Sequence, residues 1–81
     1  MQQTSIIAYL QLQPELSTRQ EQIYKTLQKI GVATNKDLSN NTGLPINSIT
    51  PRILELRKKG LVKAEYYTQQ NGRTAIAWGI V

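Results

Sequence analysis

The sequence contains no cysteine and no histidine, and only five of its 81 residues are acidic. Without cysteine, the chain has no disulfides, thiolate metal sites, iron–sulfur clusters or cysteine nucleophiles. Without histidine, it lacks the commonest general base and the commonest metal ligand. The carboxylates are scattered along the chain, and no glycine-rich loop is present to cradle a phosphate. We therefore expect a protein that is not an enzyme and that holds neither a metal nor a cofactor.

Long apolar runs are also missing. No stretch approaches the roughly 18 residues that a membrane span requires. The segment Ile6–Leu12 is too short for a secretory signal, and no basic residue precedes it. Hydrophobic residues make up 40% of the chain, which is enough for one core and too much for a disordered tail. These features predict a single small domain in a soluble, cytoplasmic protein.

The formal charge of +5 is concentrated toward the end of the chain. Residues 1–51 hold four basic and three acidic residues, whereas residues 52–81 hold six basic and two acidic residues. A small basic domain with its excess at one end favours a polyanionic partner, most often nucleic acid. A solvated surface that is merely basic is the alternative that charge alone leaves open.

Residues 1–16 form an N-terminal segment that is separate from the body of the domain. Thr4 or Ser5 is a suitable helix cap, and Pro14 would end such a helix. Its apolar residues nearly encircle a helix, which predicts burial on more than one side. A strand is the alternative, because β-branched and aromatic residues are frequent here. We interpret Ile6–Leu12 as a surface for a homodimer, or for packing on its own domain.

A second helix is expected to end at Gly31. Two capping boxes are possible at its start, Thr18 with Glu21 and Ser17 with Gln20. Its apolar residues recur at helical spacing on one stripe that we expect to be buried, namely Ile23, Leu27 and Ile30. Val32 and Ala33 then form a short extended piece.

Two further helices follow in close succession. Thr34 caps a helix from Asn35 to about Thr42, with Asp37 at the third position. The next helix runs from about Asn47 to Lys59, and its expected core stripe is Ile46, Ile49, Ile53 and Leu56. Pro51 decides where this helix begins. An N-cap at Asn47 or Ser48 would leave Pro51 near the first turn, whereas a start at Pro45 would place it inside the helix. We expect the former.

The last quarter of the chain is predicted to be a β-hairpin. Leu61–Tyr67 is expected to be a strand, with Tyr66 and Tyr67 on opposite faces, one of them in the core. The segment Thr68–Arg73 contains Asn71-Gly72, a pair favoured in hairpin turns. The return strand Thr74–Val81 places Ile76, Trp78 and Ile80 on one face, with Trp78 as a core anchor.

Three stretches carry a resemblance to a known family. They are ATNKDL at 33–38, TGLPINSIT at 42–50 and RILELRKKGLV at 52–62. Together they resemble winged helix-turn-helix domains of bacterial and archaeal transcription regulators, and small phage-encoded winged-helix proteins. The resemblance covers about residues 17–81. It implies an α+β fold, a small winged helix-turn-helix with an extra N-terminal helix and a C-terminal two-stranded wing hairpin.

The resemblance also implies a partner and a set of contacts. The partner is double-stranded DNA, and the role is that of a transcription regulator or an accessory DNA-binding protein of phage or plasmid. The recognition helix would contribute Asn47, Ser48, Thr50, Arg52 and Lys58, and the wing would contribute Gln70, Asn71 and Arg73. Their chemistry agrees, since Asn pairs with adenine edges and Arg with guanine edges. Phosphates are expected at Thr34, Asn35, Lys36 and Lys59.

The outward face of the helix after Pro45 leaves one alternative open. Advancing about 100° per residue places Asn47, Pro51, Leu54, Glu55 and Lys58 opposite the core stripe. Pro51 and Leu54 form no hydrogen bond to a base, although Leu54 suits a thymine methyl. Glu55 would be repelled by phosphate unless Lys58, Lys59 or a cytosine amine pairs with it. This face is therefore also suited to a winged-helix protein–protein contact through Pro51 and Leu54.

Overall fold

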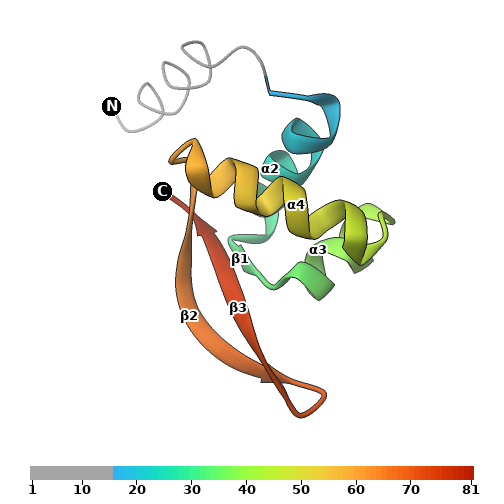
Figure 1. Cartoon of the computed structure of the whole chain (residues 1–81), viewed down its shortest axis with the longest axis vertical. Helices are drawn as coiled ribbons and strands as arrows, with labels where there is room; N and C mark the ends of the chain where they lie inside the picture. Colours follow the sequence, from blue (N-terminus) through green and yellow to red (C-terminus); the bar gives the residue numbers. More distant parts are fainter. Residues whose placement is uncertain (1–15) are drawn as a thin grey trace.

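The computed structural model describes residues 16–81 as three helices and three antiparallel strands (Figure 1). The elements are α2 Thr18–Ile30, β1 Val32–Ala33, α3 Asn35–Thr42, α4 Ile46–Lys58, β2 Val62–Gln70 and β3 Arg73–Ile80. The strand order is β1-β3-β2, so the short β1 and the hairpin share one sheet. This is the predicted α+β arrangement. The predicted N-terminal helix and the Ile6–Leu12 surface lie outside the described residues.

Local capping explains where α2 and α3 begin and end. Of the two boxes considered for α2, the structure uses Ser17 with Gln20, and Gly31 ends the helix as predicted. The α3 box forms as predicted, because the Thr34 hydroxyl accepts from the Asp37 amide and the Asp37 carboxylate accepts from the Thr34 amide. Gly43 ends α3 in the left-handed region that favours glycine.

The start of α4 differs from the prediction. Pro45 is its N-cap, so the helix begins at Ile46 and Pro51 lies inside it. The expected cap at Asn47 or Ser48 is therefore wrong. Pro51 is exposed. Because proline has no backbone N–H, the Asn47 carbonyl has no intrahelical donor, but it is open to water. Ile46 is 45% exposed, so it does not belong to the core stripe predicted for α4, and Ile30, 40% exposed, does not belong to the buried stripe predicted for α2.

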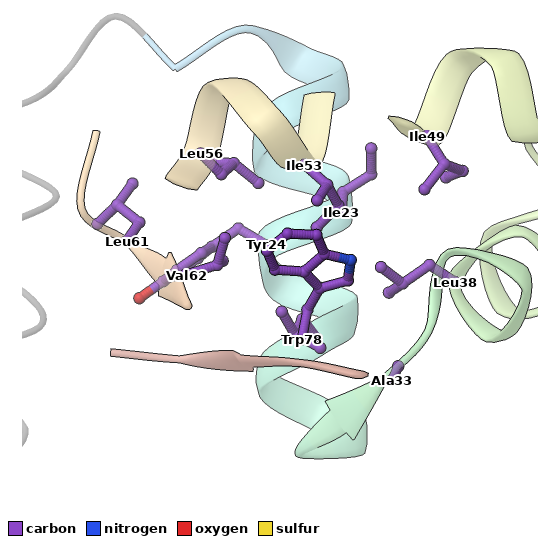
Figure 2. Close-up of a cluster of buried hydrophobic side chains, with 11 residues drawn as sticks. Ile23, Tyr24, Ala33, Leu38, Ile49, Ile53, Leu56, Leu61, Val62 and Trp78 are labelled. Carbon is purple, nitrogen blue, oxygen red and sulfur yellow. The ribbon is translucent and has the colours of Figure 1, made fainter. Parts of the chain in front are cut away.

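One core joins the helices to the sheet (Figure 2). The buried cluster contains Ile23, Tyr24, Leu27, Ala33, Leu38, Ile49, Ile53, Leu56, Leu61, Val62 and Trp78. Trp78 projects from β3 into this cluster and is only 3% exposed, which confirms it as a core anchor. Because α2, α3 and α4 all pack around it, the N-terminal ends of α3 and α4 are fixed relative to the hairpin.

The hairpin extends past the helices as a wing (Figure 1). Asn71 and Gly72 both have positive φ, 53° and 75°, as a two-residue type I′ turn requires. The strand β2 is longer than predicted, since it continues to Gln70, whereas β3 begins and ends one residue earlier than predicted. A register irregularity between Ala64 and Tyr66 marks a β-bulge. Tyr66 and Tyr67 are both exposed, so the expectation that one is buried is wrong: the strand has already passed the helical layer.

Candidate nucleic-acid interface

A groove lies between the wing and the N-terminal ends of α3 and α4. It has a volume of about 730 Å³ and is open to solvent. Its lining consists of Asn35, Lys36, Ile46, Gln70, Asn71, Arg73, Thr74, Ala75, Ile76 and Trp78. The groove therefore brings together two predicted phosphate contacts, Asn35 and Lys36, with all three predicted wing contacts. These groups come from parts of the chain more than thirty residues apart.

The α3 side of the groove is built by the helix cap. Thr34 is 3% exposed and its hydroxyl is used to accept from the Asp37 amide. Its side chain is consequently not presented to a phosphate, which corrects the role predicted for it. Asn35 donates from its amide to the Thr50 hydroxyl, 3.2 Å away, and so links α3 to α4. Lys36 is exposed.

The wing side of the groove is held against α3. The Gln70 amide donates to the Asp37 carboxylate at 3.5 Å, a long contact between the wing tip and the start of α3. The Gln69 amide donates to the Thr74 hydroxyl across the two strands at 3.1 Å. Asn71 and Arg73 are exposed at and beside the turn. The wing tip is thus tied to the helices at one polar point while its basic residue faces solvent.

The helix α4 presents three different flanks. At about 100° per residue, Asn47, Pro51, Leu54 and Lys58 lie opposite the core, and all four are exposed. Ser48, Arg52 and Glu55 lie on the flank toward α2, and Ser48 is half-buried. Thr50 and Arg57 lie on the flank toward α3 and the sheet. Of the predicted recognition residues, only Asn47 and Lys58 are on the outward face.

Arg52 is engaged in a network that the sequence did not predict. Its guanidinium donates to both oxygens of Glu55, at 2.8 and 3.0 Å, and the Gln20 amide of α2 donates to the same carboxylate at 2.6 Å. The hydrogen bond from Arg52, followed by that from Gln20, lowers the pKa of Glu55 below its ordinary value. Glu55 thus has Arg52 and Gln20 as hydrogen-bond partners, where Lys58 or Lys59 had been considered. The network ties α4 to α2.

Arg57 is a residue near the groove that sequence reasoning left unassigned. Its guanidinium carbon lies 5.7 Å from the centroid of the Trp78 ring, within the range of a cation–π contact. Trp78 also lines the groove. Arg57 lies seven residues after Thr50, and this spacing places both residues on one flank of α4. It is the sequence feature from which Arg57 could have been identified.

The comparisons with known proteins agree with this geometry. Residues 16–63, more than half of the chain, match the winged helix-turn-helix DNA-binding family. The chain belongs to that family. The resemblance inferred from residues 33–62 is thereby confirmed, and the β2–β3 hairpin is the wing.

A solved structure shares the winged-helix fold. It is that of Stf76 from the Sulfolobus islandicus plasmid-virus pSSVx, which has a TM-score of 0.64 and 16% sequence identity. The alignment covers 79% of this chain and 82% of that chain. No curated protein matches the sequence. The similarity supports the fold and agrees with the expected likeness to small virus-encoded winged-helix proteins.

Charge is distributed unevenly over this winged helix. Within residues 16–81, three of the four carboxylates form ion pairs, Glu21 with Lys25, Glu55 with Arg52 and Glu65 with Lys63. The fourth, Asp37, caps α3. Six cations in this part of the chain have no ion-pair partner, and three of them, Lys36, Lys58 and Arg73, lie at the groove or on the outward face of α4; the others are Arg19, Lys29 and Arg57. Lys59 is the half-buried C-cap residue of α4. The groove and the outward face of α4 therefore carry uncompensated positive charge.

Among residues 16–81, no group of three or more acidic, histidine or cysteine side chains is placed to hold a metal ion. No helix in that range is long and apolar enough to cross a membrane.

Proposed function

We propose that this winged helix binds duplex DNA with α4 in a major groove and the wing on the adjacent backbone. In this arrangement Asn47 faces base edges, while Lys36, Lys58 and Arg73 contact phosphates. The biological role is that of a small transcription regulator or an accessory DNA-binding protein of a phage or plasmid. Membership in a DNA-binding family supports the partner.

The observation that carries the proposal is the composition of the groove. Cationic and amide side chains from α3 and from the wing converge on one open concavity of about 730 Å³, beside the start of α4. The carboxylates of Glu21, Glu55 and Glu65 are paired elsewhere. A concave surface with excess positive charge concentrates a polyanion, and side-chain amides supply hydrogen bonds to phosphates and base edges.

The size of the site predicts modest affinity for a single copy. One helix and one wing provide few contacts, so a second half-site would strengthen binding. We expect a second copy to supply that half-site. The proposed homodimer surface is Ile6–Leu12.

The test is a fluorescence-anisotropy titration of the full chain with labelled duplexes from a random pool. Phosphate neutralisation releases counterions, so the affinity should fall steeply between about 50 and 200 mM salt. Selection of bound duplexes from the same pool should enrich a site and reveal any half-site spacing. An affinity that does not change with salt concentration, together with no enriched DNA site, would contradict the proposal and would favour a protein partner at Pro51 and Leu54.

A further inference from the structure

We propose that α4 recognises A·T base pairs and that Leu54 contacts the 5-methyl group of thymine. This inference rests on the proposed DNA-binding function and names the class of sequence that the same site reads. It follows from which side chains of α4 are free on the outward face and which are already engaged.

The two arginines of α4 are not free to read guanine. The commonest specific contact to a G·C pair is an arginine that donates two hydrogen bonds to guanine. In α4, Arg52 already donates two hydrogen bonds to the Glu55 carboxylate, at 2.8 and 3.0 Å. It also lies on the flank toward α2, because Gln20 of α2 bonds the same carboxylate. Arg57 lies over the Trp78 ring, on the opposite flank. Neither arginine of α4 is therefore aimed at a base from the outward face.

The outward face of α4 offers DNA one amide and one apolar side chain. Asn47 is exposed and its side chain has no hydrogen-bond partner within residues 16–81. An asparagine amide matches the donor and acceptor pattern of adenine in the major groove. Leu54 is 45% exposed on the same stripe. Seven residues separate the two, which places them about 10.5 Å apart along the helix axis. Leu54 can therefore meet a different base step from Asn47.

The surroundings of Leu54 on α4 match a thymine methyl better than a protein partner. Leu54 and Pro51 are flanked along the stripe by the polar Asn47 and the cationic Lys58. A protein-docking patch is a contiguous apolar area of several hundred Å², whereas Pro51 and Leu54 are two apolar residues bounded at both ends by polar ones. Of the two, Leu54 carries the methyl groups that suit a thymine methyl, between an adenine edge at Asn47 and a phosphate at Lys58. The charge of Lys58 complements DNA.

The wing adds an independent preference in the same direction. Arg73 is exposed beside the turn and has no ion-pair partner within the described residues. A-tracts have a narrow minor groove with enhanced negative potential, which attracts inserted arginine side chains. An Arg73 that contacts the phosphates beside a narrow minor groove is thus best satisfied by A·T pairs.

The test replaces thymine by uracil, which removes the methyl group and keeps every hydrogen bond. The full chain is first used to select duplexes from a random pool, and the enriched duplex is then prepared with dU at each dT in turn. We expect an A·T-rich site, and a loss of about fourfold in affinity at the contacted thymine, which corresponds to about 0.8 kcal/mol for one methyl group. Leu54→Ala should abolish the difference between dT and dU.

A matched control is Ile30→Ala, since Ile30 is a similarly exposed apolar residue (40%) at the end of α2. This variant should keep the dT-to-dU difference. Enrichment of a G·C-rich site, or unchanged affinity with dU at every position, would overturn the inference and leave the proposed function standing. Absence of binding to any duplex would overturn both.

Discussion

The sharpest prediction concerns the charges of the groove. Lys36 and Arg73 line it from opposite sides and have no ion-pair partner among the described residues. For B-DNA, each neutralised phosphate contributes about 0.9 to the slope of log affinity against log salt. Over a fourfold rise in salt, one contact therefore changes affinity about 3.5-fold and two contacts about 12-fold. The double variant Lys36→Ala/Arg73→Ala should lose about 1.8 from the slope.

The matched control removes the same formal charge from other surfaces. Lys25 pairs with Glu21 on α2, and Lys63 pairs with Glu65 near the start of β2. Lys25→Ala/Lys63→Ala should leave the slope close to that of the unmodified chain. Both variants are titrated with one labelled duplex by anisotropy at about 50, 100 and 200 mM salt. An equal loss of slope in the two variants would contradict the assignment of Lys36 and Arg73 as phosphate contacts, since it would show that net charge and not the groove governs binding.

Three further predictions concern stability, each followed by urea unfolding with the fluorescence of Trp78, the one tryptophan in the sequence. Ile53→Ala should destabilise the domain by about 2–5 kcal/mol, because Ile53 is fully buried beneath α4; an effect below about 1 kcal/mol would contradict the described core. Pro51→Ala should stabilise the domain by about 1 kcal/mol, because the restored helical N–H outweighs the entropy that the unfolded chain gains. A large destabilisation would contradict the position of Pro51 inside α4. Because the folded pKa of Glu55 is lowered, its bonds to Arg52 and Gln20 stabilise the fold at neutral pH and are lost as the pH falls through that lowered pKa. The stability difference between the unmodified chain and Glu55→Gln should therefore be present at pH 7 and close below about pH 4, whereas a difference that grows in acid would contradict this sign.

Features encoded in neighbouring residues were predictable from the sequence. The capping box of Thr34 and Asp37 lies within one helical turn, and the Asn71-Gly72 turn depends on the backbone freedom of two adjacent residues. Trp78 followed from alternation along one strand. Asn35 and Lys36 were named because they open α3, whereas Gln70, Asn71 and Arg73 were named because the resemblance to winged helices implies that the hairpin is the wing.

Features that depend on contacts between distant segments were not predictable. Arg52 and Glu55 are three residues apart on α4, but the hydrogen bond that the Glu55 carboxylate also accepts from Gln20 comes from another helix. The exposure of both tyrosines depends on how far β2 extends beyond the helices, and on the bulge at Ala64–Tyr66. The hydrogen bond from Asn35 to Thr50 likewise joins two separate helices. Each of these features depends on contacts that residue spacing within one element does not specify.

The DNA contact can be mapped directly on the protein surface. Backbone and side-chain amide resonances of the full chain are recorded by NMR during titration with the selected duplex. We expect the largest shifts at Asn35, Asn47, Asn71 and Arg73, around the groove and the start of α4. Shifts concentrated instead on α2 or around Lys63 and Glu65, with the groove unchanged, would contradict this expectation.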